Sequence, residues 1–362
     1  MKKITSMILA LVFAVSLIGS ASAKTLKIQL TFPKTSYDGQ IVKMWTDRVT
    51  KLTRGELKFE LLSKGEVVGL KETLEAVDKG LVDGGAAWTH YWSNYHPAAM
   101  LFGSPVAGGG IGLSTKSWLA WYFDNGGMEL YDQLWDEMGM NVKGFVMASS
   151  GPEALGWFKE PINSMADFRK YRFRTPPGIP GQTYKDIGVA SVSMGGGDIL
   201  PALEKGTIDA AEWCCPKPDS VFGFQKVLKN YYLQGLHQNV VNGDIYINGD
   251  VYKSLTDHQK YAMEVASEAM ITRNITNRAV ENGKALIDLT ENHGVILHDT
   301  PADYFVEYMN AAQATIAKNA KENAFFKKVY EHMTAHAKIV VPFIAQMETS
   351  DAAIGTAFAS QQ

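Results

Sequence analysis

An arginine and a glutamate each stand at the end of a short strand-like segment, a place where a ligand could reach them. Arg174 lies in the run YRFRTPPG, in which Pro176 and Pro177 stop an alternating strand. A guanidinium there can hold a carboxylate through two parallel hydrogen bonds, each worth about 1.5–3 kcal/mol. The competing interpretation of Arg174 is a surface ion pair. Glu212 follows the small-residue run IDAA, where an unpaired carboxylate is costly, so its partner is Arg174 or a bound cation.

The segment that leads to Glu212 repeats an earlier segment of the chain. Residues 74–88 read LEAVDKGLVDGGAAW, and residues 200–214 read LPALEKGTIDAAEWC. Each copy predicts a short amphipathic helix, a glycine stop and a strand of small residues. Because one such unit cannot bury its own apolar face, two copies indicate two similar α/β lobes. Ligands of open α/β sheets bind beyond the carboxyl ends of strands, so the two segment ends should meet at a cleft.

The first 23 residues predict a secretory signal peptide rather than part of the fold. Lys2 and Lys3 precede an apolar run at residues 8–18, and small residues at 21–23 form a cleavage site. The run is too short to span a bilayer. Loss of the two lysines changes the formal charge from −3 to −5, and no basic tract is interleaved with aromatic residues, which argues against a nucleic-acid partner. We therefore expect an exported, periplasmic protein.

The rest of the chain alternates between strand-like and helical segments, which predicts doubly wound, mainly parallel sheets flanked by helices. Thr256 and Gln259 form a capping box before a helix at 257–292, which would reach about 54 Å and run along both lobes. The tail at 301–347 is helical, with a kink expected at Pro342. A helix rich in Trp and Tyr is expected at 117–138. The expected strands lie at 25–30, 57–62, 142–147, 172–175, 191–193, 244–247 and 295–298.

These elements divide into two lobes and a tail. Lobe I is expected to comprise residues 24–149 plus about 240–270, and lobe II residues 150–239 plus about 271–300. Residues 301–362 would pack on the lobes or on a second subunit. Cys214 and Cys215 would lie beside the cleft, either as a strained vicinal disulfide or as two buried thiols, and the sequence leaves both open.

Three motifs make the chain resemble a solute-binding protein of a TRAP transporter, of the DctP type. They read YRFRTPPG, GGGDILPALEKGTIDAAEWCCP and KVLKNYYLQGLHQ, and the similarity extends over essentially the whole mature chain. ALEKGTIDAAEW and the GWF at 156–158 are typical of the branch that binds 2-oxo acids and lactate. The resemblance implies a periplasmic-binding-protein-like fold that closes by hinge motion on a 2-oxo or 2-hydroxy acid and delivers it to the membrane permease. It also implies homodimers that exchange a C-terminal helix.

The resemblance assigns roles to individual residues. Arg174 matches the arginine that binds the substrate carboxylate. Glu212 and the Trp213 carbonyl match ligands of a metal ion that bridges protein and substrate. Gln238 falls where another polar ligand is expected, and Tyr91 where a ring lies against the substrate. The many rings near the mouth of the cleft favour a ligand with an apolar or aromatic body. The expected substrate contacts are Phe32, Trp88, Tyr91, Glu153, Arg174, Trp213 and Gln238, and the expected metal ligands are Glu153, Glu212, Trp213 and Gln238.

Glu153 departs from the family pattern, because related 2-oxo-acid binders usually carry a glutamine there. Glu153 and Glu212 beside Arg174 leave a net charge of about −1, which an anionic ligand would raise to about −2. At 4 Å and an effective dielectric of about 20, each like-charge pair costs about 4 kcal/mol. We therefore expect a divalent cation in the site, with Ca²⁺ favoured over Na⁺. The alternative is that Glu153 points to solvent.

The alternative function is an exported metal-dependent hydrolase or lyase that acts on a carboxylate. His90, His96 and His237 near the expected cleft would support it, but none has ligand spacing of the HExxH kind. The sequence also lacks a phosphate-binding loop and a nucleophile elbow. We therefore expect a binding protein and not an enzyme.

Overall fold

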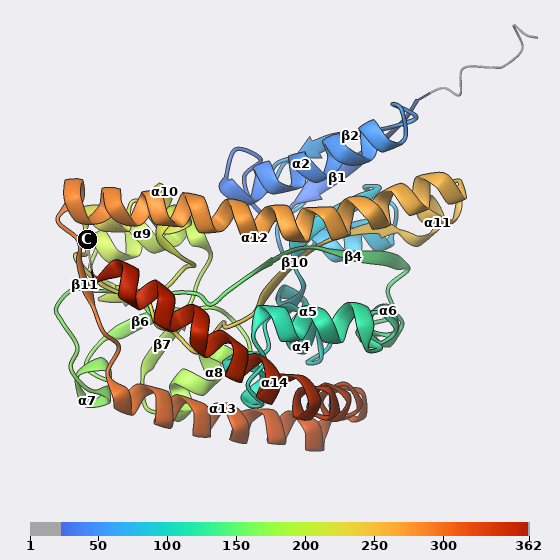
Figure 1. Ribbon diagram of the computed structural model, residues 1–362. Helices are drawn as coiled ribbons and strands as arrows, with labels where there is room; N and C mark the ends of the chain where they lie inside the picture. Colours follow the sequence, from blue (N-terminus) through green and yellow to red (C-terminus); the bar gives the residue numbers. More distant parts are fainter. Residues whose placement is uncertain (1–22, 361–362) are drawn as a thin grey trace, which may run out of the picture.

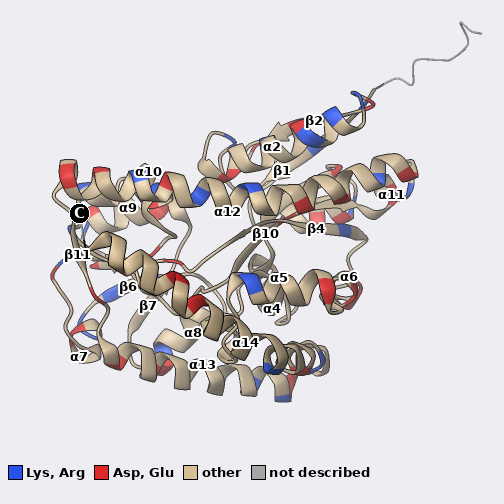
Figure 2. Cartoon of the chain, viewed as in Figure 1, with Lys and Arg blue, Asp and Glu red and all other residues tan. Residues whose placement is uncertain are grey.

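The computed structural model describes residues 23–360 as two α/β lobes that lie side by side (Figure 1). The expected signal peptide lies outside the described residues, apart from Ala23. Among the described residues, no helix combines the length and the apolar character needed to cross a membrane. Acidic and basic residues are interspersed along the helices of both lobes (Figure 2).

The first lobe is built on a five-stranded sheet with the order β2-β1-β3-β10-β4. β1 pairs in parallel with β2 and β3, whereas β10 runs antiparallel to both of its neighbours. The sheet is therefore parallel except for one strand. Its members are β1 (Lys24–Leu30), β2 (Leu57–Leu62), β3 (Gly84–Trp88), β4 (Val142–Ser150) and β10 (Val241–Asn248).

The second lobe has a six-stranded sheet with the order β11-β9-β5-β8-β6-β7. Here β5 alone among the described strands runs against its neighbours, so the prediction of two mainly parallel sheets is confirmed. β5 and β9 have three residues each, too few to show a strand pattern, and the sequence analysis did not include them as strands. The members are β5 (Gly156–Phe158), β6 (Arg172–Thr175), β7 (Ala190–Ser193), β8 (Ala210–Ala211), β9 (Asn230–Tyr232) and β11 (Ile296–His298).

The repeated segments form the same helix–glycine–strand unit in the two sheets. α3 (Thr73–Asp78) leads through Gly80 to β3, and α9 (Gly196–Glu204) leads through Gly206 to β8. Both glycines have left-handed backbone, with φ of 69° and 65°, a conformation that an L side chain resists. The two units are therefore structural equivalents, as the sequence repeat predicts.

The conserved spacing of the repeat also places one aspartate at the same point of each unit. Asp83 accepts a hydrogen bond from the Lys27 backbone N–H of β1 at 2.8 Å, and Asp209 accepts one from the Arg172 backbone N–H of β6 at 3.3 Å. Each carboxylate thus ties the repeat strand to the parallel strand beside it. This bond fixes where the carboxyl ends of the paired strands lie.

One helix, α12 (Asp257–His293), runs along both lobes (Figure 1). It begins with the expected capping box, since Thr256 accepts the Gln259 N–H at 3.2 Å and Gln259 accepts the Thr256 N–H at 3.1 Å. α12 packs against β4 and α2 (Tyr37–Leu52) of the first lobe and against α10 (Pro216–Phe222) of the second. The long helix therefore connects the two lobes.

Two segments outside the helices and strands also connect the lobes, at 151–155 between β4 and β5 and at 233–240 between β9 and β10. They are bonded to one another, because the Glu153 N–H donates to the Gln238 carbonyl at 3.0 Å. The lobe bounds given above stay a prediction.

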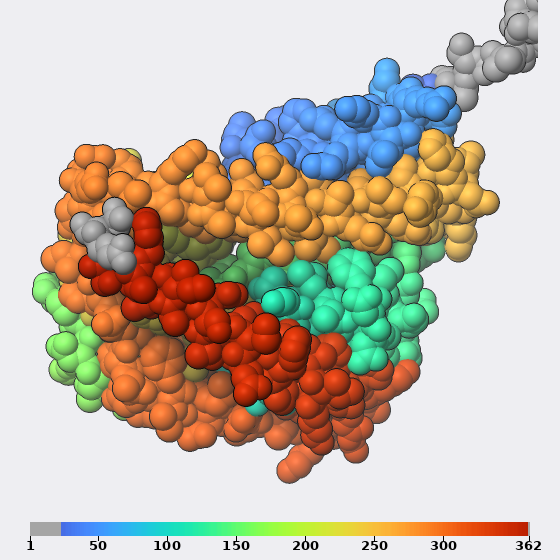
Figure 3. All heavy atoms as spheres, in the orientation of Figure 1, coloured from blue at the N-terminus to red at the C-terminus, as the bar shows by residue number. Residues whose placement is uncertain are grey.

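Two expectations about helices need correction or refinement. The helix expected at 117–138 is two helices, α5 (Thr115–Asp124) and α6 (Gly127–Glu137), because Gly126 adopts left-handed backbone at φ 76°. In the tail, the chain breaks at Asn323, which caps the following helix, and Pro342 lies inside that helix without ending it. The tail comprises α13 (Ala302–Glu322) and α14 (Ala324–Ala359), and Figure 3 shows α14 lying across one face of the molecule.

The remaining helices are α4 (Ala99–Gly103), α7 (Met165–Phe168), α8 (Ile179–Asp186) and α11 (Gly249–Lys253), with 3-10 segments at Thr89–Asn94, Val106–Gly110 and Phe224–Lys226.

Candidate ligand-binding site

Arg174 and Glu212 are in direct contact at the carboxyl ends of β6 and β8. The strands are parallel neighbours, with Arg174 opposite Ala211 in the register. Arg174 Nη1 donates to Glu212 Oε1 at 2.5 Å and to the Glu212 carbonyl at 2.9 Å, while Nε and Nη2 donate to the Met194 carbonyl. These four bonds leave one of the five guanidinium N–H groups for a ligand. Both side chains are buried, so the pair is shielded from solvent.

Arg172, two residues earlier on β6, lies in a different environment. Its guanidinium is half exposed and pairs with Asp209 at 2.7 Å. An exposed pair of this kind contributes little to stability. The competing interpretation of Arg174, a surface ion pair, therefore applies to Arg172 instead. Arg172 can serve as a matched control for experiments on Arg174.

A buried group of three side chains surrounds the free side of Glu212. One ligand atom each from Glu153, Glu212 and His237 lies within 4.8 Å of the others. Among the described residues, Glu153 Oε2, Glu212 Oε2 and His237 Nε2 have no hydrogen-bond partner, although each atom is buried. Burial, together with the charge of Glu212, raises the pKa of Glu153 well above its usual range. Two buried carboxylate oxygens without donors fit a cation, because a positive charge would compensate both at once.

Glu153, a member of this group, lies in one of the two segments that connect the lobes, and Gln238 lies in the other. Both side chains are buried, and the described contact between the residues is through the main chain. The next residue, Ala154, donates its N–H to the Cys214 carbonyl at 2.8 Å, which ties the Glu153 segment to the chain that follows Glu212. Glu153 therefore points to the interior and not to solvent.

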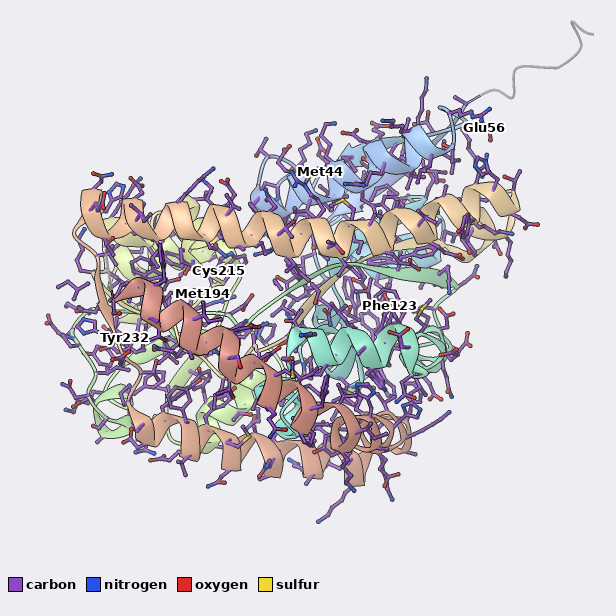
Figure 4. All side chains as sticks on the ribbon, viewed as in Figure 1. Met44, Glu56, Phe123, Met194, Cys215 and Tyr232 are labelled. Atoms are coloured by element: carbon purple, nitrogen blue, oxygen red, sulfur yellow. The ribbon has the colours of Figure 1, made fainter. Side chains whose placement is uncertain are left out.

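Trp213 and the two cysteines follow Glu212. The Trp213 ring lies against the Arg174 guanidinium, with 5.1 Å from Cζ to the ring centre, and against Phe222. Cys214 and Cys215 are buried free thiols in contact with one another, so the alternative of two thiols applies in this structure. Figure 4 shows Cys215 and Met194 in the second lobe, below α12.

A single buried carboxylate, Asp219, holds this stretch of chain in place. Its Oδ1 accepts the backbone N–H groups of Cys214 and Cys215, and its Oδ2 accepts Trp157 Nε1–H and Tyr231 Oη–H, all at 2.9–3.2 Å. Burial nevertheless raises the pKa of Asp219 to about 7. Asp219 thus fixes the backbone directly after the Glu212–Trp213 pair.

Three aromatic residues of the first lobe were expected to contact the ligand. Trp88 ends β3 and is half-buried, and its ring lies 6.0 Å from the Arg278 guanidinium. Burial raises the pKa of Tyr91, whose ring packs edge-on against His90. Phe32, by contrast, packs against the core beneath the first sheet.

Arg278 of α12 is a second buried cation that the sequence analysis did not single out. It donates to Asp38 of the first lobe at 2.9 Å and to Cys214 Sγ of the second at 3.3 Å. The Tyr37 ring covers it at 4.8 Å. Arg278 therefore bonds to both lobes from the helix that they share.

Sequence signals existed for the two residues that were missed. Arg278 ends a row of buried α12 residues spaced by four, namely Ala266, Met270, Asn274 and Arg278. An asparagine and an arginine that continue an apolar stripe indicate a buried polar contact. His237 was noted as near the cleft, but only as support for an enzyme. His96 accepts the Ala98 N–H and contacts Asn323, and burial lowers the pKa of His90 to about 4; neither belongs to the buried group.

A two-lobed α/β fold with a buried arginine and two buried carboxylate oxygens that lack donors is typical of bilobed solute-binding proteins. A family model described as bacterial extracellular solute-binding protein, family 7 (DctP), matches residues 30–323. The chain belongs to this family.

Relatives and solved structures agree with the family. The chain is 31% identical over 298 residues to a monocarboxylate 2-oxoacid-binding periplasmic protein of Nostoc sp., covering 80% of this chain and 78% of the relative. A TRAP transporter solute-binding protein of Bordetella bronchiseptica, solved as a mixed-occupancy dimer with copurified calcium and picolinate, has a TM-score of 0.86 at 25% identity and covers 94% of this chain and 99% of its own. A Pseudoalteromonas atlantica protein with bound sodium and pyruvate has a TM-score of 0.82 at 22% identity, covering 92% and 98%.

Proposed function

We propose that this protein is exported to the periplasm, captures a small organic carboxylate between its lobes and delivers it to the membrane permease of a TRAP transporter without altering it chemically. Arg174 binds the ligand carboxylate through its one free N–H and through the positive charge of the guanidinium. Glu153, Glu212, the Trp213 carbonyl and Gln238 hold a cation that bridges the ligand to the second lobe. Trp88 and Tyr91 cover the ligand from the first lobe.

The observation that carries this proposal is the pair of buried carboxylate oxygens, Glu153 Oε2 and Glu212 Oε2, that lack donors beside Arg174. A buried charge without a partner costs several kcal/mol, so a cation in this position stabilises the site. When bound, the cation supplies positive charge that attracts the ligand's anionic oxygens. The residues themselves fix the position and orientation of the carboxylate.

The ligand class that fits best is a carboxylate with a second donor atom on the neighbouring carbon. Pyruvate offers a keto oxygen there and picolinate a ring nitrogen, so either can contact one cation with two atoms. Both occur with a cation in the solved relatives, which supports a 2-oxo acid, a 2-hydroxy acid or an aromatic analogue as the ligand. The rings of Trp88, Tyr91 and Trp213 favour a ligand with a flat or apolar body.

Charge favours Ca²⁺ over Na⁺ as the cation. Arg278 and Asp38 compensate one another, which leaves two carboxylates against Arg174 before the anionic ligand is counted. A divalent ion neutralises this excess where a monovalent ion leaves part of it. Relatives with calcium and with sodium are both known, so the preference is a property of this chain's own residues.

A thermal-shift and calorimetry screen tests the proposal. The mature protein, treated with EDTA and dialysed, is titrated with pyruvate, lactate and picolinate in the presence of Ca²⁺, Na⁺ or EDTA. We expect stabilisation of about 4 kcal/mol at a ligand concentration one thousand times its Kd, with the largest effect in Ca²⁺. Acetate, which lacks the second donor, is the matched control and should stabilise less. Absence of any shift with every acid, or conversion of the ligand to a product, would contradict the proposal.

We infer in addition that the protein forms a homodimer through α14. The second half of this helix exposes apolar side chains at spacings of four and seven residues, namely Phe343, Met347, Ile354 and Phe358, each more than half exposed. Such a stripe is the pattern of a helix that packs on another helix. A dimer would remove the stripe from water, and a related structure is a dimer.

Sedimentation tests the dimer. The wild-type protein is expected to sediment as a dimer, and the double variant Phe343→Glu/Met347→Glu as a monomer with unchanged helix content. Ala345→Glu introduces a charge on another face of the same helix and should leave the dimer intact. A monomeric wild-type protein at tens of micromolar would rule the interface out.

A further inference from the structure

His237 is the third member of the buried group, and its two ring nitrogens face different partners. Nε2 lies 3.5 Å from Glu212 Oε2, a distance beyond an ordinary hydrogen bond. Nδ1 lies 3.3 Å from the hydroxyl of Tyr184, which is itself 3.1 Å from the hydroxyl of Tyr304. The side chains of all three residues are fully buried. Whether Nε2 carries a proton or a lone pair therefore depends on this row of hydroxyls.

The donor and the acceptor of each hydrogen bond among these side chains follow from the number of hydrogens that they carry. The Tyr304 hydroxyl oxygen accepts the backbone N–H of Leu236 at 3.0 Å. The hydrogen of this buried hydroxyl needs an acceptor, because leaving it unpaired would cost about 1–3 kcal/mol. Among the described residues, the oxygen available to it is that of Tyr184. Tyr184 thus accepts from Tyr304 and donates to His237 Nδ1.

A neutral imidazole that accepts at Nδ1 carries its proton on Nε2. That N–H points toward Glu212 Oε2 and has no lone pair to offer a metal. The remaining candidate ligands are the oxygens of Glu153, Glu212, Trp213 and Gln238. An all-oxygen set suits hard cations such as Ca²⁺, whereas an imidazole nitrogen suits Zn²⁺ or Ni²⁺.

We propose that Tyr304 and Tyr184 hold His237 in the tautomer that keeps its Nε2 out of the metal's coordination, so that the site selects hard cations over transition metals. This inference rests on the proposed function, because it concerns the cation of the same site. His237 acts as a positioning residue: its Nε2–H faces the outer oxygen of Glu212, and the tyrosines act through it. The selectivity is then set by residues that do not touch the cation.

Nitrogen NMR on the metal-free protein tests the tautomer directly. The protein is labelled with ¹⁵N histidine, and His237 is assigned by comparison with His237→Gln. We expect the Nε2–H pattern for this ring. In Tyr184→Phe the Nδ1 partner is lost, and the two tautomers should become comparable. An Nδ1–H pattern in the wild-type protein would overturn the proposal, whether or not any cation or carboxylate binds.

Metal selectivity provides the second readout. Kd values for Ca²⁺ and Zn²⁺ are measured by chelator competition, without an organic ligand. Tyr184→Phe is expected to shift the ratio of the two Kd values toward Zn²⁺ by about tenfold or more. His237→Gln in the Tyr184→Phe background should remove this shift, because no imidazole remains. Tyr308→Phe is the matched control, since the Tyr308 ring packs on Tyr184 but its hydroxyl points to the Pro180 carbonyl.

The outcomes separate this inference from the proposed function. An unchanged ratio in Tyr184→Phe, with both metals still binding, would contradict the role of the tyrosines and leave carboxylate capture intact. Failure of the wild-type protein to bind any cation would instead contradict the cation of the proposed function. The NMR pattern would still decide the tautomer in that case.

Discussion

Replacing Arg174 by alanine is expected to weaken carboxylate binding by at least about a hundredfold. The ligand loses the hydrogen bond from the one free N–H, worth about 1.5–3 kcal/mol, and the attraction of a unit positive charge, worth about 4 kcal/mol at 4 Å and an effective dielectric of 20. Their combined loss corresponds to two decades or more in Kd. Calorimetry on the calcium-loaded mature protein, with the ligand that stabilises it most, measures the change. Wild-type affinity in Arg174→Ala would remove this residue from the site.

The alanine variant also leaves Glu212 buried without its partner, which costs about 3–5 kcal/mol of folding stability. Arg174→Lys separates the loss of ligand binding from the loss of stability. The ammonium keeps a positive charge beside Glu212, but it lacks the planar fork of N–H groups of the guanidinium. We expect Arg174→Lys to melt near the wild-type temperature and to bind about ten- to a hundredfold more weakly. Arg172→Ala, on the same strand but half exposed, should bind normally.

Glu212→Gln is expected to abolish the dependence of ligand affinity on Ca²⁺. The amide has nearly the same shape, and its oxygen can still accept from Arg174 Nη1, so the local fold should survive. It lacks the negative charge, whose interaction with a nearby unit charge is worth about 4 kcal/mol at 4 Å and an effective dielectric of 20. We therefore expect Ca²⁺ to bind at least about a hundredfold more weakly.

The measurement is a calcium titration followed by ligand titrations with and without EDTA. In the wild-type protein EDTA should weaken ligand binding, and in Glu212→Gln it should make no difference. Glu204→Gln, an exposed glutamate eight residues earlier, is the matched control. A calcium response that persists in Glu212→Gln would show that the cation is held elsewhere.

The parts of the fold that were predicted correctly are those with local patterns. The repeat, the glycine stops and the capping box of Thr256 and Gln259 each depend on a few neighbouring residues, and the structure has all of them. The contact between Arg174 and Glu212 follows from one further rule, that parallel strands end at the same edge of a sheet. Local chemistry and one topological rule were therefore sufficient to bring these two side chains together.

The missed features depend on contacts between distant segments. β5 and β9 have three residues each, and their strand character comes from the pairing with one another. His237 lies in a connecting segment, and its importance appears only when Tyr184 and Tyr304 are seen beside it. Arg278 bonds to Asp38, which lies 240 residues earlier in the chain. The local sequence indicates that Arg278 is buried, but it does not identify a partner so far away in the chain.

The two segments that connect the sheets also carry Glu153 and Gln238, bonded main chain to main chain. In the hinge closure implied by the proposed function, the backbone of these two segments would change together with α12, because all three connect the lobes. Ligand binding and lobe closure would then involve the same residues, without a conformational change inside either lobe. A ligand that does not contact the two connecting segments would leave the lobes open. The choice between ligands would then be made at the segments where the protein bends.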